Sequence, residues 1–201
     1  MNLPNKLTIL RIIMTPLFMA AMLIEFPHHY AVALILFVVA SLTDLLDGHI
    51  ARARNIVTNF GKFLDPLADK MLTTSAFIAF LGLNFGLGIS WVLFIVLFRE
   101  FMIASLRLVA VSSETKKVIP ANIWGKIKTV TQMVNIIFGI AVLYFEDSIL
   151  PLIECVTAVP SIISTILLTV FNITLWVSTA FTILSGVVYM KDSFEFIDPS
   201  K

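Results

Sequence analysis

Four aspartates, Asp44, Asp47, Asp65 and Asp69, lie close together in a chain that is 59% hydrophobic and 13% charged. Their spacings of three and four residues place the members of each pair on one face of a helix. A cluster of carboxylate oxygens suits hard cations such as Mg²⁺ or Mn²⁺. Two such cations that share bridging carboxylates support displacement at phosphorus. We therefore interpret the cluster as a candidate two-metal site.

The energetic cost of this cluster argues against a purely structural role. A carboxylate at the centre of a membrane helix costs roughly 2.5–3.5 kcal/mol, and less near the interface. Four neighbouring negative charges also repel one another. An ion-pair network with Arg52, Arg54 and Lys62 is the structural alternative, but divalent cations neutralise the cluster more effectively.

Small residues accompany the aspartates on the same helix faces. Gly48, Ala51 and Gly61 leave room for a ligand to lie against the backbone. Close packing of helices is the alternative explanation for such residues. Pro66 is compatible with a helix that begins near residue 64, because the first turn has spare N–H groups.

The composition of the 201 residues indicates an integral membrane protein. The mean hydropathy is +0.98, and the charged fraction is well below the roughly 25% of soluble domains. We predict one all-α domain, residues 1–201, with six transmembrane helices, since a span needs about 20 apolar residues. The last segment is long enough to begin with a separate interfacial piece. The predicted spans are residues 7–25, 30–50, 64–83, 89–111, 124–145 and 162–190.

The basic residues predict the orientation of these helices. The connecting segments 25–30, 82–88 and 146–160 contain no Lys or Arg, whereas the 52–62 and 112–126 loops contain several. The positive-inside rule then places both termini and the aspartates on the cytoplasmic side of the cell membrane. The apolar start lacks a clear small-residue cleavage site, so we expect a retained first helix rather than a signal peptide.

The stretch between residues 44 and 69 also follows the pattern D-x₂-D-G-x₂-A-R-x₈-G-x₃-D-x₃-D. This pattern resembles the signature of the CDP-alcohol phosphotransferases at all eight positions. The layout of the whole chain is similar to that family. The resemblance implies an active site at the cytoplasmic ends of helices two and three, with an amphipathic segment at the N-terminus.

Members of that family join a CDP-linked lipid or alcohol to a second alcohol and release CMP. The resemblance implies that Asp44, Asp47 and Asp65 bind two ions of Mg²⁺ or Mn²⁺. It implies that Asp69 both binds metal and accepts the proton of the acceptor hydroxyl. The small residues of the motif would admit the nucleotide. Arg52 either holds phosphate or pairs with an aspartate.

Three short segments indicate the acceptor. Residues 2–12, 99–107 and 125–132 resemble the bacterial phosphatidylglycerophosphate synthase branch, whose members use CDP-diacylglycerol and glycerol-3-phosphate. The branch therefore implies phosphatidyl transfer to glycerol-3-phosphate. Cations near the aspartates would hold the acceptor phosphate. Ordinary positive-inside anchoring is the alternative role for these cations, which are Arg107, Lys126 and Lys128.

Two further pairs of polar residues have predicted roles. Asn5 and Thr8 either contact the nucleotide from an amphipathic first segment or cap a helix at the membrane surface. Arg99 and Glu100 are expected to pair with neighbouring helices, because charges within a membrane find partners.

Three other functions compete with this interpretation. A sister enzyme would use inositol phosphate, phosphatidylglycerol, serine or another alcohol. A divalent-metal transporter would spread its polar residues through the bilayer and often shows two related halves, whereas here the carboxylates gather at one end. A structural membrane protein would not need the motif. The net charge of +1 gives no indication of nucleic-acid binding, and we predict a homodimer by resemblance to the family.

Overall fold

A computed structural model describes residues 3–54, 59–112, 123–154 and 160–193. Within these ranges, the side chains of residues 3–4, 45–54, 59–63, 65, 109–112, 154 and 160–161 lie outside the description. The described chain is helical, as predicted, and its six long helices overlap the six predicted segments. These are α1 (Leu3–Leu23), α2 (His29–Arg54), α3 (Asn59–Gly82), α4 (Ile89–Ser112), α5 (Ile123–Tyr144) and α7 (Pro160–Asp192).

Four stretches of the described residues are long and apolar enough to cross a membrane, so the chain is a multi-pass membrane protein. They are Asn5–Leu23, Ile89–Leu108, Ile123–Ile153 and Ile162–Asp192. Among the described side chains of α2, His29–Asp44 forms a shorter apolar stretch. The six-span topology therefore stays a prediction.

Helix boundaries differ from the prediction at three places. The predicted outer loop 146–160 is helical as far as residue 154, because α5 continues through a π-helical turn, η1 (Phe145–Ile149), into α6 (Leu150–Glu154). The last long helix, α7, is continuous from its first residue, without a separate interfacial piece. Pro66 lies inside α3 rather than in its first turn, because α3 begins at Asn59.

The N-terminal segment, which the sequence predicts to be amphipathic, begins a long apolar helix and turns polar side chains inward. It is the first part of α1, which packs against α2 and α3. The face of α1 that these helices cover carries three buried polar residues at three-residue spacing, namely Asn5, Thr8 and Arg11. The opposite face exposes Leu10, Ile13 and Leu17. An apolar exterior and a polar interior are the arrangement expected in lipid.

A glycine allows close packing in the middle of the helix bundle, where α5 lies against α7. A methyl group at Gly139 would lie 2.6 Å from the ring of Phe171 on α7 and 2.8 Å from the ring of Phe80 on α3. Such contacts are too short for any Cβ atom. Gly139 thus lets α5 approach the aromatic core that joins it to α3 and α7.

Polar side chains add a second connection between α5 and α7. Gln132 Nε2 donates a hydrogen bond to Thr182 Oγ1 at 3.1 Å, and Asn135 Nδ2 donates one to Thr174 Oγ1 at 2.8 Å. Both amide side chains are buried. Interhelical hydrogen bonds of this kind help to hold membrane helices together. They restrain the register of the two helices.

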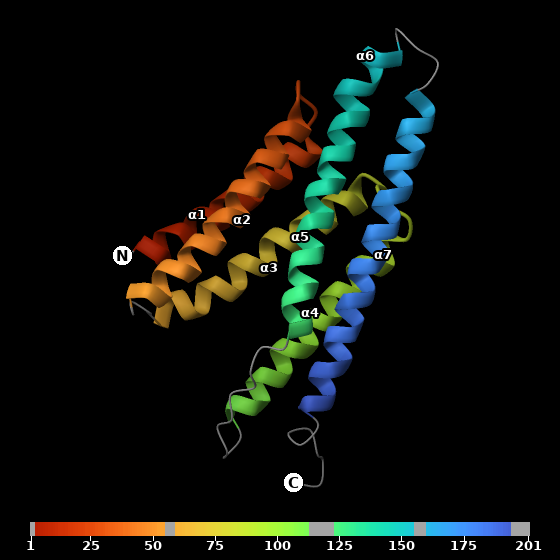
Figure 1. Cartoon of the computed structure of the whole chain (residues 1–201). Helices are drawn as coiled ribbons and strands as arrows, with labels where there is room; N and C mark the ends of the chain where they lie inside the picture. The colour runs from red at the N-terminus through yellow and green to blue at the C-terminus, as the bar shows by residue number, and fades with distance from the viewer. Residues whose placement is uncertain (1–2, 55–58, 113–122, 155–159, 194–201) are drawn as a thin grey trace.

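The helix ends gather on two sides of the molecule. Figure 1 shows the beginnings of α1, α3 and α5 and the ends of α2, α4 and α7 toward the lower left, with α6 and the α1–α2 and α3–α4 turns on the opposite side. The motif on α2 and α3 therefore lies at the same end of the molecule as the basic residues of α4 and α5.

Candidate active site

The four motif aspartates lie on two consecutive helices, in the last part of α2 and the first half of α3. The structure describes the side chains of Asp44 and Asp69. The side chains of six other motif residues lie outside the description: Asp47, Gly48, Ala51, Arg52, Gly61 and Asp65. Their assigned roles stay predictions.

Asp44 has a basic partner that the sequence did not reveal. Arg11 of α1 is fully buried, and its Nη1 lies 2.6 Å from Asp44 Oδ1. A buried guanidinium without a counter-charge would be strongly destabilising, so this ion pair ties α1 to the motif. The regular spacing of Asn5, Thr8 and Arg11 on one helix face was the available signal. The proposed alternative partners, Arg52, Arg54 and Lys62, lie in the segments whose side chains are not described.

The observed carboxylates fit a hard divalent cation. Asp44 and Asp69 come from the two helices that carry the motif. Both offer oxygen ligands, which Mg²⁺ and Mn²⁺ prefer. Among the side chains that the structure describes, no three acidic, histidine or cysteine residues come together. Asp47 and Asp65 are the remaining ligands of the predicted set.

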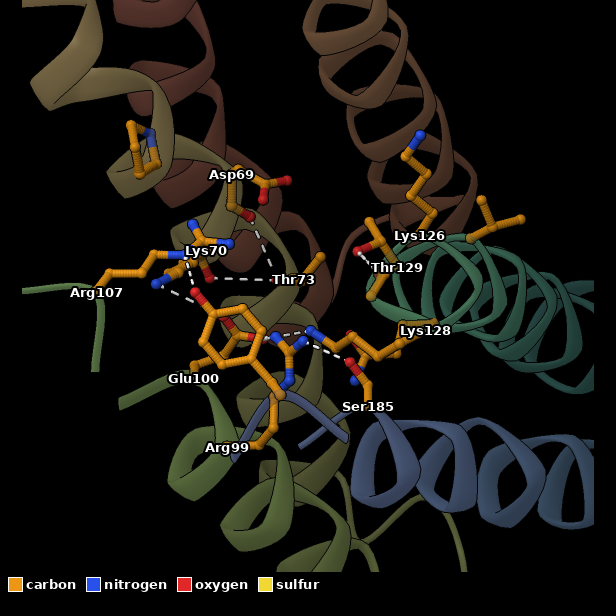
Figure 2. A pocket seen from close by; sticks show the side chains of 15 residues that line it. Asp69, Lys70, Thr73, Arg99, Glu100, Arg107, Lys126, Lys128, Thr129 and Ser185 are labelled. Atoms are coloured by element: carbon orange, nitrogen blue, oxygen red, sulfur yellow. Dashed lines mark hydrogen bonds and ion pairs between the residues drawn. The ribbon is translucent and has the colours of Figure 1, made fainter. Parts of the chain in front are cut away.

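Asp69 also lines a cavity of about 610 Å³ between α3, α4, α5 and α7 (Figure 2). Two carboxylates, Asp69 and Glu100, contribute to its wall. Five basic residues contribute as well: Lys70, Arg99, Arg107, Lys126 and Lys128. The cavity therefore has an excess of positive charge beside the predicted catalytic aspartate, which suits an anionic ligand.

Glu100 contacts three of the five cations. Its Oε1 accepts a hydrogen bond from Lys128 Nζ and another from Arg99 Nη1 at 2.8 Å. Its Oε2 lies 3.6 Å from Lys70 Nζ. Arg99 Nη2 also donates to Ser185 Oγ on α7 at 2.7 Å. The prediction that Arg99 and Glu100 pair with neighbouring helices is confirmed.

The three predicted acceptor-binding cations differ in their surroundings. Arg107 is exposed, and its Nε donates a hydrogen bond to the Tyr189 hydroxyl at 3.2 Å. Lys126 is exposed and points away from the Glu100 cluster, with no ion pair among the described residues. Lys128 is 6% exposed and is bound to Glu100. All three line the same cavity, but only Arg107 and Lys126 have charges that Glu100 does not neutralise.

Asn5 and Thr8 lie within α1 and are both buried, at 8% and 0% exposure. The suggestion that they cap a helix at the membrane surface is wrong, because α1 begins before them and its polar face packs inward. Contact with the nucleotide stays a prediction for both residues. Lys70, Ser185 and Tyr189 line the cavity without having been predicted, because each is brought there by packing between helices.

The chain belongs to the CDP-alcohol phosphatidyltransferase family, whose sequence profile matches residues 1–190. The resemblance seen in the aspartate motif is thereby confirmed. The match extends over every helix that contributes to the site.

Individual relatives indicate one branch of this family. A "CDP-diacylglycerol--glycerol-3-phosphate 3-phosphatidyltransferase" of Bacillus subtilis (strain 168) is 36% identical, and the alignment covers 99% of this chain and 98% of the relative. A protein with the same name from Rickettsia bellii is 36% identical over 94% of each chain. A "Probable phosphatidylglycerophosphate synthase" of Mycobacterium tuberculosis (strain H37Rv) is 38% identical, over 92% of this chain and 85% of the relative.

Proposed function

We propose that this protein transfers a phosphatidyl group from CDP-diacylglycerol to glycerol-3-phosphate, giving phosphatidylglycerophosphate and CMP. The cavity beside Asp69 is the observation that carries the proposal, because it is a basic chamber next to a carboxylate of the family motif. The names and the end-to-end similarity of the relatives support the same donor and acceptor.

Two bound Mg²⁺ or Mn²⁺ ions would neutralise the diphosphate of the donor and make the phosphorus that carries the diacylglycerol more electrophilic. Asp44, Asp47, Asp65 and Asp69 would hold them. Asp69 accepts the proton of the acceptor hydroxyl as the new oxygen–phosphorus bond forms. The bond between the lipid-side phosphorus and the oxygen that bridges the two phosphates breaks, and CMP leaves with that oxygen.

Arg107 and Lys126 hold the phosphate of glycerol-3-phosphate in this proposal. A doubly charged phosphate is repelled by the motif carboxylates, so cations must bind it on the side away from the metals. Arg107 and Lys126 come from different helices and face the cavity that Asp69 lines. In Figure 2, Asp69 and Lys126 lie on opposite sides of this space. Lys128 supports the site through Glu100 rather than by direct phosphate contact.

The test is release of CMP from CDP-diacylglycerol by the purified protein, with and without glycerol-3-phosphate. The proposal requires CMP release that depends on glycerol-3-phosphate and on a divalent cation. Activity with inositol phosphate, phosphatidylglycerol or serine instead would assign the protein to a sister branch. Metal flux in proteoliposomes without CMP release would favour the transporter.

The proposed topology has six spans, with both termini and the active site in the cytoplasm of the cell. Cys155, which lies outside the described residues, is then on the far side of the membrane. A membrane-impermeant maleimide should label it in intact cells, and labelling from the cytoplasmic side alone would contradict the orientation. We also propose a homodimer, which light scattering of the detergent-solubilised protein tests through its mass.

A further inference from the structure

Glu100 lines the same cavity as Asp69 and the predicted acceptor cations. It is 15% exposed and comes from α4, while its three basic partners come from α3, α4 and α5. Lys70 is next to Asp69 in the sequence, and Lys128 lines the same cavity as Asp69. Glu100 thus holds two ammonium groups that lie near a predicted metal ligand.

The two lysines do not depend on Glu100 to the same degree. The Lys70 side chain is 39% exposed and lies 3.6 Å from the carboxylate, so solvent can replace that contact. The Lys128 side chain is only 8% exposed and hydrogen-bonds to Glu100. A buried ammonium that loses its carboxylate needs another anion, and Asp69 is the other acidic residue on the wall of this cavity.

We propose that Glu100 is a positioning residue that keeps the ammonium group of Lys128 away from Asp69, so that the Asp69 carboxylate stays available to a divalent cation. The inference rests on the proposed metal-dependent function. It adds a task for a residue that touches neither substrate nor metal. This role also explains why the Glu100 carboxylate lies in a cavity that is proposed to bind the negatively charged acceptor.

Binding of Mn²⁺ alone tests this role without turnover. Electron paramagnetic resonance of free Mn²⁺ gives its dissociation constant for four purified proteins: wild type, Glu100→Gln, Lys128→Met and the double variant. An ammonium paired with Asp69 weakens the site, and we expect Glu100→Gln to raise the dissociation constant about tenfold. The double variant should bind Mn²⁺ within about twofold of Lys128→Met, since no ammonium remains to compete.

Glu146→Gln is the matched control, because Glu146 lies in η1 and accepts a hydrogen bond from Ser164, away from the cavity. It should bind Mn²⁺ as the wild type does. Unchanged affinity in Glu100→Gln, or equal weakening in that variant and the double variant, would overturn the proposal.

If Glu100→Gln fails to fold, the double variant can still be compared with Lys128→Met. The double variant lacks both charges of the pair, so it buries no unpaired ammonium group and should fold more readily than Glu100→Gln. If it binds Mn²⁺ about tenfold more weakly than Lys128→Met, Glu100 acts by another route and the proposal fails. A wild type that binds no Mn²⁺ would instead overturn the proposed metal-dependent function, and the inference with it.

Discussion

The aspartate motif and the basic cavity are neighbouring regions built in different ways. The motif occupies one continuous stretch, from Asp44 to Asp69, on two consecutive helices. The cavity takes its wall from four helices, between Pro66 and Tyr189. Asp69 belongs to both regions. The proposed metal ligands are thus set by local spacing, whereas the cations of the proposed acceptor site come together only through contacts between distant segments.

This division predicts separate kinetic effects. Changes in the motif should lower kcat or weaken metal activation, because they act on the reacting phosphorus. Changes to the cavity cations Arg107 and Lys126 should raise the KM for the acceptor, because they act on a phosphate that does not react. The following substitutions test the division, beginning with the largest expected effect.

Asp69→Asn should reduce kcat by about 10²–10⁴-fold, the usual contribution of a positioned general base. Binding of CDP-diacylglycerol should change little. CMP release and donor binding are measured on the same preparation, with Asp192→Asn at the exposed end of α7 as the control. Near-normal turnover of Asp69→Asn would show that Asp69, the residue shared by the motif and the cavity, is not the general base.

Replacing Asp44, Asp47 or Asp65 with Asn should raise the Mg²⁺ or Mn²⁺ concentration for half-maximal activity by at least about tenfold. Loss of a residue that only supports a metal ligand already lowers metal affinity or activity about 10–100-fold. Excess chelator should stop the wild-type reaction. Asp44→Asn should also lower the melting temperature, because buried Arg11 loses this carboxylate. Full activity in excess chelator would contradict the two-metal mechanism.

Neutral residues at Arg107 or Lys126 should raise the KM for glycerol-3-phosphate by roughly ten- to a hundredfold, because each hydrogen bond between charged groups contributes roughly 1.5–3 kcal/mol. The KM for CDP-diacylglycerol should change much less. Methionine keeps an unbranched, flexible stem and removes the charge, and Lys191→Met, at the exposed end of α7, is the control. An unchanged KM for glycerol-3-phosphate would show that these two cavity residues do not bind the acceptor.

Tyr189→Phe should have the smallest effect of these substitutions. It removes the hydroxyl that accepts a hydrogen bond from Arg107 but keeps the ring, whose centroid lies 5.7 Å from the guanidinium carbon. Loss of one such bond is worth about 0.5–1.5 kcal/mol, so the acceptor KM should rise about two- to tenfold. A fall in kcat with no change in KM would show that Tyr189 does not act through Arg107.

The motif, the family and the positions of six long helices could all be predicted from the amino-acid sequence. These features depend on spacing within one helix and on long apolar stretches, which are local properties. The helix boundaries around residues 146–154 were missed, because hydropathy does not distinguish an extended helix from an apolar loop. Pro66 was misplaced for a similar reason, since proline marks a helix start more often than an interior.

The pairing of charges between helices became visible only in the folded structure. Arg11 reaches Asp44 because α1 turns its polar face toward α2, and Lys128 reaches Glu100 because α4 and α5 place these residues on one cavity. Tyr189 contacts Arg107 across more than eighty residues of sequence. Such pairs depend on the rotation and register of packed helices, which arise from the sum of many contacts, such as the close approach at Gly139. No spacing within a single helix encodes them.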